Sequence, residues 1–458
     1  FPHEKIRLEG EEDPVVVTTR RETDGSFFVS AKVYDVYRET TAKPEPADEE
    51  HLVLSVTLYR LLSGILGFAP PWGVLYGVRP AKLMHRLCAQ MGDDAAVAHF
   101  QTAFLTQKSK AELAHEVMLH ENRSIARSGP KSFSLYVSIP FCPTRCAYCS
   151  FVSHSIEKTH KLMTPYVDLL LRELEETSKY AKELGLELAT VYFGGGTPTT
   201  LSAQDLGRIF STIEQNFDLS HLMEYTVEAG RPDTVTRERL EVIRAAGVQR
   251  ISINPQSFND KVLEAIGRRH TAQQTLDAFA LARDCGFDHI NMDFIAGLPE
   301  DDLPSFQRSI QTALDLQAES ITVHTLALKT SAYMVTREQT FDLKDRLTVS
   351  NMVDYAGQTL HGAGYYPYYM YRQSKSLGNL ENVGWCKPGY DCLYNVYMMD
   401  ETHTVLAVGA GAVTKLRGQN SGMIERIYNY KYPYEYIRDF DTLLERKKRI
   451  PGFYAEYD

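Results

Sequence analysis

Residues 135–151 read LYVSIPFCPTRCAYCSF and hold three cysteines within eight positions. Cys142, Cys146 and Cys149 have the spacing C-x3-C-x2-C. The run 135–139 before them is apolar and contains β-branched residues, which predicts a strand. Two prolines flank the first cysteine and interrupt regular structure there. The sequence therefore predicts a cysteine loop, residues 140–149, that begins at the end of a strand.

Three thiolates at this spacing predict a soft metal centre. A structural zinc ion normally takes four ligands, so a zinc site would need completion by His154 or His160. A [4Fe–4S] cluster also normally takes four cysteines, and three would leave one iron open to a small molecule. The spacing alone leaves both interpretations open.

Downstream of this loop, short apolar runs alternate with longer segments of helical periodicity. Such alternation is typical of a parallel sheet with right-handed crossovers. It predicts an α/β core, a partial (β/α)6 barrel, over residues 131–330. The expected strands are 135–139, 190–193, 224–228, 249–254, 289–295 and 320–326, and the expected helices are 164–184, 203–216, 236–246, 271–285 and 303–316.

In such sheets, ligands bind at the carboxyl ends of the strands. Polar or glycine-rich residues fall at or near the ends of the expected strands. The glycine run 194–196 lets a ligand approach the main chain closely, and Glu228 is suited to accept hydrogen bonds from ribose hydroxyls. The residues near the later strand ends are Gln256, Asp293 and His324.

Composition narrows the function classes. The 458 residues carry a net charge of −10 and no dense Lys/Arg block, which argues against nucleic-acid binding. No apolar run reaches 18 residues, so no membrane span is expected. Seven cysteines, four of them scattered, are typical of a reducing cytosol, so we expect a cytoplasmic protein. Among the scattered four, Cys386 and Cys392 are too few for a second cluster.

The flanking regions differ in composition from the core. The pattern of residues 1–130 predicts a separate α+β module. Its expected strands are 15–19 and 27–33, and its expected helices are 52–66, 81–91 and 110–127. None of its motifs by itself indicates a catalytic or binding function. Residues 331–458 predict a smaller α+β domain that covers the barrel mouth and the substrate, with a tyrosine-rich stretch at 364–372. The basic stretch 446–449 is short and predicts a solvated helix end.

The motifs together carry a family resemblance. The cysteine spacing with Tyr148 before the last cysteine, and the run 194–199 after the second strand, resemble the radical S-adenosylmethionine (SAM) signature. Within that superfamily the chain is most similar to oxygen-independent coproporphyrinogen III oxidases, also called coproporphyrinogen dehydrogenases. The supporting stretches are 136–142, 194–199, 250–258, 266–270, 291–299 and 409–412. The N-terminal module and residues 378–384 resemble the longer subgroup with an extended N-terminus.

The resemblance implies a set of cofactor contacts. Cys142, Cys146 and Cys149 would hold a [4Fe–4S] cluster, and one SAM would bind its open iron. Positions that match contacts of this first SAM are Tyr136, Gly195 and Glu228. Positions that match contacts of a second SAM are Tyr148, Gly196, Thr197, Gln256, Arg268, Asp293 and Ala327.

The activity that the resemblance implies is an oxidative decarboxylation in porphyrin and haem biosynthesis. A 5′-deoxyadenosyl radical would take a hydrogen from a propionate of coproporphyrinogen III, and loss of carbon dioxide and an electron would leave a vinyl group. Two rounds would give protoporphyrinogen IX. The expected partners are this tetrapyrrole and a reducing protein such as ferredoxin or flavodoxin. A haem chaperone without oxidase activity, or a haem-modifying methyltransferase or ring-opening enzyme, is the alternative.

The chain departs from the family pattern at two strand ends. Asn254-Pro255-Gln256 replaces the common Gly-Val-Gln, and Gly230-Arg231-Pro232 follows Glu228 where others are closer to Asp-Pro. The glutamine and the glutamate of the family pattern are nevertheless present in this chain, as Gln256 and Glu228. A tetracarboxylate substrate would need local cations, for which the C-terminal region offers Arg372, Lys375, Lys415 and Arg417, although an ordinary surface role is about twice as frequent for each.

Overall fold

The computed structural model describes residues 15–45, 49–149, 154–327 and 343–458. Ser150 and Phe151, the end of the cysteine stretch, lie outside these ranges. The chain divides into two compact units, which are described separately. The first comprises residues 1–119 and 370–381, and the second comprises residues 120–369 and 382–458. The predicted division into domains 1–130, 131–330 and 331–458 stays a prediction.

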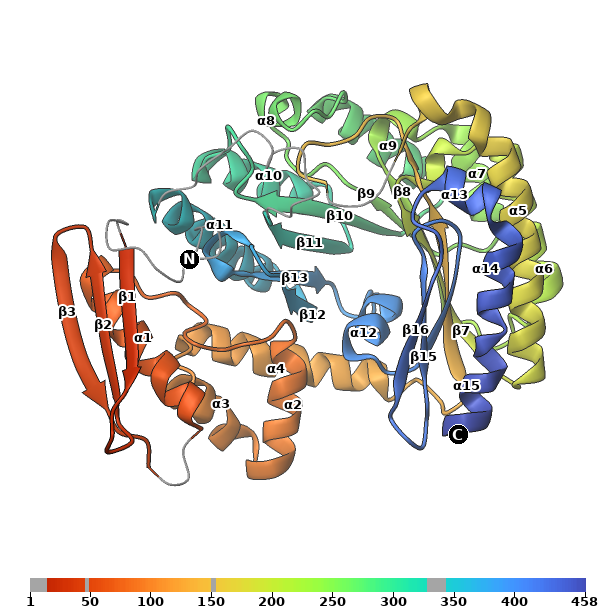
Figure 1. Ribbon diagram of the computed structural model, residues 1–458. Helices are drawn as coiled ribbons and strands as arrows, with labels where there is room; N and C mark the ends of the chain where they lie inside the picture. The colour runs from red at the N-terminus through yellow and green to blue at the C-terminus, as the bar shows by residue number, and fades with distance from the viewer. Residues whose placement is uncertain (1–14, 46–48, 150–153, 328–342) are drawn as a thin grey trace. The chain divides into compact units, whose positions relative to one another are not determined.

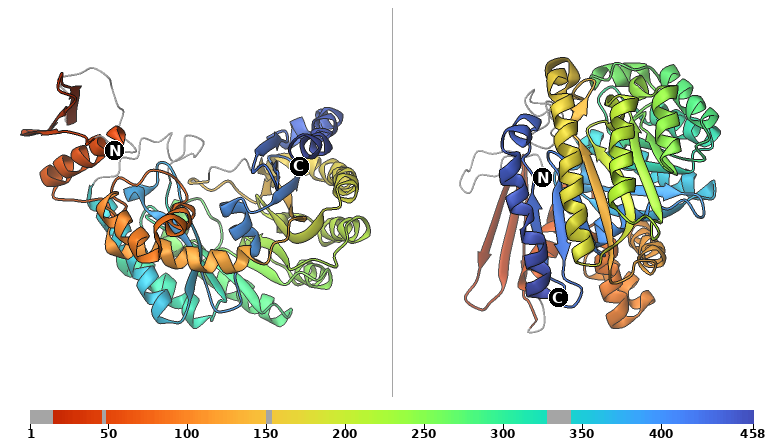
Figure 2. Two further views of the ribbon diagram at one scale, coloured as in Figure 1. Left: turned by 90° about the horizontal axis from the view of Figure 1, so that it is seen from below. Right: turned by 90° about the vertical axis from the view of Figure 1, so that its right-hand side faces the viewer.

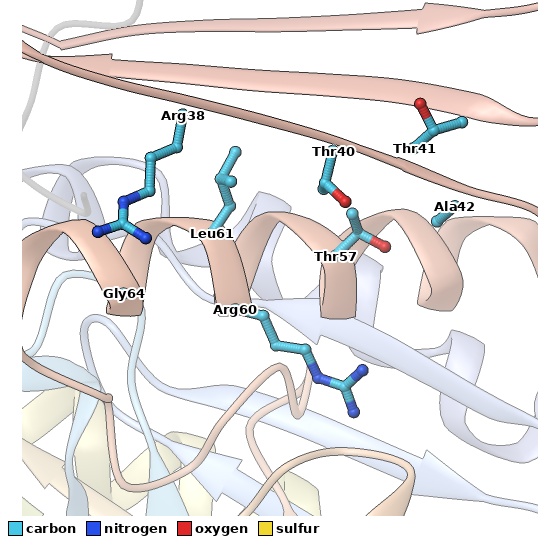
Figure 3. A pocket seen from close by; sticks show the side chains of 8 residues that line it. All are labelled: Arg38, Thr40, Thr41, Ala42, Thr57, Arg60, Leu61 and Gly64. Atoms are coloured by element: carbon cyan, nitrogen blue, oxygen red, sulfur yellow. The ribbon is translucent and has the colours of Figure 1, made fainter.

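The first unit begins with a three-stranded antiparallel sheet of order β1–β2–β3. Its helix α1 packs on β2 through Leu61, Val29 and Ala31. A pocket between β3 and α1 is lined by residues that include Arg38, Thr40 and Arg60 (Figure 3). The elements are β1 (Val15–Arg21), β2 (Phe27–Val33), β3 (Val36–Ala42), α1 (Glu50–Leu66), α2 (Pro80–Met91), α3 (Asp93–Thr102) and α4 (Lys108–Ile125).

The strands and helices predicted for this unit are confirmed, and two further elements are present. The side chains of β3 are almost all exposed, so this strand lacks the apolar alternation that marks a half-buried strand. Helix α3 has ten residues and only two buried side chains, Ala96 and Phe100, so its periodicity is weak.

The second unit is built on a sheet whose centre is the predicted series of six parallel strands (Figure 1). They are β4 (Ser132–Ile139), β7 (Glu187–Gly195), β8 (Glu224–Gly230), β9 (Arg250–Ile253), β10 (His289–Ala296) and β11 (Ser320–Thr325). The mixed α/β class with a parallel core is therefore confirmed. The full order is β12-β13-β11-β10-β9-β8-β7-β4-β14-β15-β16, which does not close on itself within the described residues.

The C-terminal region adds strands to the same sheet. β14 pairs in parallel with β4, and β13 pairs antiparallel with β11. The added strands are β12 (Tyr366–Arg372), β13 (Glu381–Cys386), β14 (Thr404–Val408), β15 (Val413–Arg417) and β16 (Ile424–Tyr428). The two flanks of the parallel core are thus extended by residues distant in sequence.

Helices cover the outer side of the parallel strands, as the side view shows (Figure 2). The predicted ones are α5 (Ile156–Glu183), α6 (Ala203–Asn216), α7 (Arg237–Ala245), α9 (Ala272–Asp284) and α10 (Leu303–Asp315). Their polar starts act as caps, since Thr236 accepts from the Arg239 amide and Thr271 forms a capping box with Gln274. The other helices are α8 (Asp260–Ala265), α11 (Leu343–Gly362), α12 (Leu393–Asp400), α13 (Pro433–Arg438), α14 (Phe440–Lys447) and α15 (Arg449–Tyr457).

The first helix of this series begins earlier than predicted. The sequence predicts a start at residue 164 for this helix. Instead α5 begins at Ile156 and holds Pro165 in its interior. The neighbouring Tyr166 and Val167 are fully buried, so tertiary packing offsets the missing backbone hydrogen bond.

Alternation along the parallel strands separates an apolar face from a polar one. On β4, Leu135 and Val137 are fully buried beneath the helices, while Ser134 and Tyr136 point to the opposite face. Ser134 hydrogen-bonds Thr190 of β7 on that face, at 2.7 Å. The polar face gives the strand ends their functional side chains. No helix in the described part of the chain is long and apolar enough to cross a membrane.

Candidate functional site

The cysteine loop leaves the end of β4 as predicted. β5 (Phe141–Cys142) pairs with β6 (His154–Ser155), and the Ala147 amide donates to the Ile266 carbonyl at 2.9 Å. Cys146 is buried, and Cys142 and Cys149 are half-buried. None of the three forms a disulfide within the described residues, so their sulfurs can act as ligands.

The two histidines of the zinc alternative differ in burial, and the buried His154 Nε2 has no hydrogen-bond partner among the described residues. The His154 ring meets Tyr432 and Tyr434 edge-on, with centroids 5.7 and 6.4 Å away. His160 is exposed on α5. Nothing in these contacts directs either ring toward the cysteine sulfurs.

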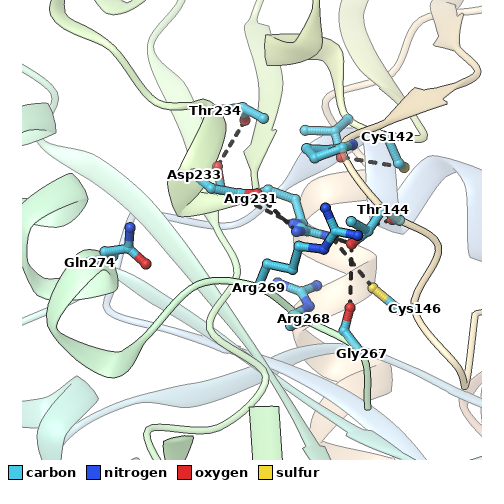
Figure 4. Close-up of polar contacts among 12 residues, drawn as sticks. Cys142, Thr144, Cys146, Arg231, Asp233, Thr234, Gly267, Arg268, Arg269 and Gln274 are labelled. Carbon is cyan, nitrogen blue, oxygen red and sulfur yellow. Dashed lines mark hydrogen bonds and ion pairs between the residues drawn. The ribbon is translucent and has the colours of Figure 1, made fainter. Parts of the chain in front are cut away.

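Two hydrogen-bond donors approach the cysteine sulfurs from neighbouring strand ends (Figure 4). Thr197 Oγ1 lies 3.5 Å from Cys142 Sγ, and Arg231 Nη1 lies 3.8 Å from Cys146 Sγ. Arg231 is buried and is held by Asp233 at 2.9 Å and by Thr144 Oγ1 at 2.9 Å. Donors of this kind stabilise thiolate over thiol, so the surroundings fit metal-ligating sulfur.

Arg231 is a site residue that the sequence analysis did not select. It appeared there only as a departure from the family pattern after Glu228. That departure is the signal, because an arginine introduced at a strand end that faces the site is costly to bury without a partner. The structure places this arginine beside Cys146 of the loop.

The glycine run packs against the cysteine loop itself. The Gly196 amide donates to the Ile139 carbonyl at 2.7 Å, and the Thr197 amide donates to the Phe141 carbonyl at 2.8 Å. A Cβ on Gly196 would lie 2.5 Å from the Phe141 oxygen, which is too close for any side chain. Gly195 has a φ of +102°, a conformation that favours glycine. The run therefore fixes the loop's path through backbone contacts.

A buried polar group connects Tyr148 of the loop to the next strand end. Arg268 Nη2 donates to the Tyr148 hydroxyl at 3.1 Å, and its Nη1 donates to the Asn254 carbonyl at 2.6 Å. Burial raises the pKa of Tyr148, and the Arg268 charge opposes that rise. Arg268 Nε and Asn254 Oδ1 are buried and have no hydrogen-bond partner among the described residues. Because such atoms are costly to leave unpaired, they fit a polar ligand that completes them.

Gln256 and Asp293 also lie side by side. The Gln256 amide donates to the Asp293 carbonyl at 2.9 Å. Gln256 has a φ of +67°, a strained conformation of the kind found at functional sites. The Asp293 carboxylate accepts from Asn291 at 2.8 Å and lies 3.9 Å from His324 Nε2. Ala327 follows two residues after the end of β11 and is half-buried.

The residues expected around the first SAM are joined by a tyrosine stack. The rings of Tyr136 and Tyr192 are 6.3 Å apart, and Tyr394 of α12 stacks on Tyr192 at 4.4 Å. The Tyr192 hydroxyl donates to Glu228 at 2.6 Å. Burial, aided by the nearby charge of Asp293, raises the pKa of Glu228 to about 7.

Sequence reasoning missed Tyr192 and Tyr394. Tyr192 could have been found, because it lies opposite Tyr136 in the register of β4 and β7 and shares the polar face of the sheet. Tyr394 had none, because only the fold brings α12 near β7.

The cations expected for substrate carboxylates are mostly engaged elsewhere. Arg372 is buried in the first unit, where Nη1 donates to the Leu75 carbonyl at 2.8 Å and burial lowers its pKa to about 10. Lys415 is also buried and donates to the Met398 carbonyl at 3.0 Å. Arg417 lies 3.4 Å from Gln419 Oε1, and Lys375 is exposed. These contacts favour structural roles for Arg372 and Lys415.

Comparison with known proteins shows the family to which the chain belongs. The model of the radical SAM superfamily matches residues 136–313. The chain is 35% identical over 453 residues to the oxygen-independent coproporphyrinogen-III oxidase-like protein HemZ of Bacillus subtilis strain 168, across 96% of this chain and 90% of that protein. It is 31% identical to the heme chaperone HemW of the same strain, across 68% and 79%. Among solved structures, coproporphyrinogen III oxidase (HemN) of Escherichia coli, a radical SAM enzyme, superimposes with a TM-score of 0.53 at 22% identity, across 71% and 72%.

The chain belongs to the radical SAM superfamily and, within it, to the family of oxygen-independent coproporphyrinogen-III oxidase-like proteins. Membership of the superfamily implies a [4Fe–4S] cluster and SAM. The three loop cysteines without disulfides, the donors on two of their sulfurs and the unpaired buried atoms of Arg268 and Asn254 fit such a pair of cofactors.

Proposed function

We propose that this protein decarboxylates two propionates of coproporphyrinogen III to vinyl groups without oxygen, giving protoporphyrinogen IX. The proposal is supported by the near full-length similarity to a coproporphyrinogen-III oxidase-like protein. The observation that carries it is the pairing of Arg268 with Tyr148 of the cysteine loop, where Arg268 Nε and Asn254 Oδ1 are buried without a partner among the described residues. When bound, the cluster and SAM supply a hydrogen-abstracting radical.

The side chains divide into three roles in this proposal. Cys142, Cys146 and Cys149 hold the cluster. Tyr136, Gly195 and Glu228 position the first SAM. The second SAM lies against the residues Tyr148, Gly196, Thr197, Gln256, Arg268, Asp293 and Ala327.

The surrounding assignments belong to the same proposal. Residues 331–458 cover the bound tetrapyrrole and exclude water from the reacting carbon. A ferredoxin- or flavodoxin-like protein supplies the electron, and the reaction takes place in the cytoplasm. The first unit has no assigned part in the chemistry.

An anaerobic conversion assay tests the oxidase. Reconstituted protein, a reductant and SAM are incubated with coproporphyrinogen III, and vinyl products are measured. Formation of the divinyl product supports the proposal. A second candidate, a haem chaperone, is favoured by the relative that carries this name at 31% identity. No conversion, combined with tight haem binding, would favour the chaperone, and conversion of haem itself would favour a haem-modifying enzyme.

Arg268→Ala tests the placement of the second pocket. Loss of this guanidinium should impair turnover while iron and sulfide contents stay at the parent level. Arg269→Ala is the matched control, because Arg269 is exposed and only pairs with Glu157 at the surface. Loss of the cluster in Arg268→Ala would contradict the placement.

A further inference from the structure

A second group of metal-ligand side chains lies in the first unit, outside the cysteine loop. Cys88, Asp93 and His115 bring one ligand atom each to within 4.8 Å of one another. They are the only such set of three among the described residues. His115 Nε2 lies 3.0 Å from Asp93 Oδ2.

Three different helices position these side chains. Cys88 is in the last turn of α2, Asp93 opens α3 and His115 lies in the middle of α4. Gly92, with a φ of +85°, makes the turn that brings Asp93 back toward Cys88. Helix α2 also buries Met84, one turn before Cys88, and Leu87 beside it, so the position of Cys88 is held by packing as well as by polar contacts.

The donor set matches zinc or a similar divalent transition metal. Zinc binds thiolate, imidazole and carboxylate, and open sites have three protein ligands with water in the fourth position. Zinc bonds of about 2.0–2.3 Å place tetrahedral ligands roughly 3.3–3.6 Å apart. On binding, the wider pairs of this set would therefore contract, and the His115–Asp93 pair would widen slightly. Calcium and magnesium prefer oxygen ligands alone and are disfavoured by the thiol and the imidazole.

We propose that Cys88, Asp93 and His115 form a divalent transition-metal site, preferably for zinc, that ties α2, α3 and α4 together. On binding, Cys88 loses its thiol proton to solvent and becomes a thiolate, and His115 binds as a neutral imidazole through Nε2. The Asp93 carboxylate supplies the second negative charge. The fourth position faces solvent, since Asp93 is exposed and the other two are half-buried.

A nucleophilic role for Cys88 is disfavoured by the same geometry. A nucleophile is activated by a base beside it, with a third group that orients the base. Here the carboxylate stands next to the thiol, and burial together with the negative charge of Asp93 raises the pKa of Cys88 to about 11. A bound cation would reverse that effect.

Cobalt binding to the full chain tests the site. The variant C142A/C146A/C149A removes the cluster ligands, so that a thiolate-to-cobalt absorption band reports the remaining cysteines. We expect one equivalent of Co²⁺ with such a band, displaced by Zn²⁺. Adding Cys88→Ala or His115→Ala should weaken binding beyond the roughly 10–100-fold loss caused by removing an outer-shell partner. Cys285→Ala is the matched control and should leave the band unchanged, because Cys285 is half-buried in the second unit.

The cobalt titration can support or overturn the proposed metal site. The absence of a thiolate band, or a band that persists in Cys88→Ala, overturns the proposal. Asp93→Asn changes an exposed side chain and keeps its shape, so it should not disturb folding. It should also weaken metal binding, and this result would show that a loss seen in Cys88→Ala is not merely a folding defect. The same titration on the holoprotein, with its cluster in place, should give one further equivalent of metal.

Discussion

Two buried polar networks lie near the end of β4, and they differ in how completely their charged groups are paired. In the first, Glu173 of α5 and Lys447 of α14 form an ion pair of 2.7 Å with both side chains fully buried. The carboxylate also accepts from the Gly409 amide and the Tyr436 hydroxyl, at 2.8 and 2.6 Å. The ammonium also donates to the Ala407 carbonyl at 2.7 Å.

The second network surrounds the cysteine loop and is incomplete. Arg268 and Asn254 each keep a buried polar atom without a partner among the described residues. Glu228 is largely buried with one hydrogen bond, from Tyr192, and with the repulsive charge of Asp293 nearby. An incomplete network of this kind is unfavourable unless a ligand completes it.

Tyr166 connects the 409–410 loop beside the first network to Ser138 at the end of β4. The Tyr166 hydroxyl donates to the Ser138 carbonyl at 2.7 Å and accepts from the Ala410 amide at 2.9 Å. The charges of the first network are thus satisfied within the protein, while the second network leaves charged and polar groups that a ligand could complete. Burial of a charged residue therefore does not by itself indicate a functional site, whereas a buried charged group with incomplete pairing is a candidate for one.

Lys447→Met should cause the largest loss of stability. The substitution leaves Glu173 buried without its cation, and breaking such a pair costs about 3–5 kcal/mol. Urea unfolding of the full chain measures the change in the free energy of unfolding.

The double variant E173Q/K447M should recover most of the stability lost in Lys447→Met, because a neutral pair leaves no unpaired buried charge. Lys448→Met is the control, since Lys448 and its partner Glu445 are exposed and a surface pair contributes about 0–1 kcal/mol. Equal unfolding of the single and double variants would contradict the coupling.

Gly196→Ala should disturb the loop and cost about 1–3 kcal/mol through overpacking. The new methyl would meet the carbonyls of Phe141 and Ile139, at 2.5 and 2.9 Å, and neither is a flexible side chain. We expect lower iron and sulfide contents after anaerobic reconstitution. Gly207→Ala on α6 is the matched control, because its Cβ would meet only Val242 at 3.7 Å, and it should raise stability by about 0.4–1 kcal/mol. Parent-level iron in Gly196→Ala would show that the loop can move without consequence.

The parallel core could be predicted because its signals are local. The alternation of apolar and polar residues marks each strand, and glycines and capping residues mark where each helix stops and starts. Thr236 and Gly247 bracket α7 as the sequence indicated. The cysteine spacing and the glycine run follow the first two strands in the chain, so their meeting at one edge of the sheet follows from the parallel topology alone.

The remaining features depend on contacts between distant segments. Lys447 lies in a basic stretch that predicts a solvated helix end, and this prediction is wrong for Lys447, whose side chain is fully buried against Glu173. No local pattern distinguishes it from its exposed neighbour Lys448. The same holds for Tyr394, which reaches Tyr192 only because α12 packs near β7.

Glu228→Gln should change stability in a pH-dependent way. The folded pKa of about 7 exceeds the ordinary value of 4.5, so the native state holds a proton that the unfolded state releases between these values. Stability therefore falls as pH rises through this window. The variant should be more stable than the parent by about 1–2 kcal/mol at pH 8, discounted for partial exposure, and equal to it near pH 4.5. Urea midpoints of the cofactor-free chain at both pH values measure this, and Glu238→Gln, an exposed site on α7, should show no such pH dependence. A constant difference across the window would contradict the assignment.

Arg231→Gln should have the smallest effect on stability, because Gln can keep a hydrogen bond to Thr144 while Asp233 becomes partly exposed to water. Its main effect should be on the cluster. A guanidinium 3.8 Å from Cys146 Sγ favours the reduced, more negative state of any iron–sulfur centre held there. Removing about 1 kcal/mol of that attraction would lower the one-electron potential by roughly 40 mV. Arg269→Gln, an exposed arginine whose partner is Glu157, should leave the potential unchanged in an anaerobic redox titration followed by electron paramagnetic resonance. If both variants shift the potential equally, the effect comes from net charge and Arg231 has no specific place beside the cluster.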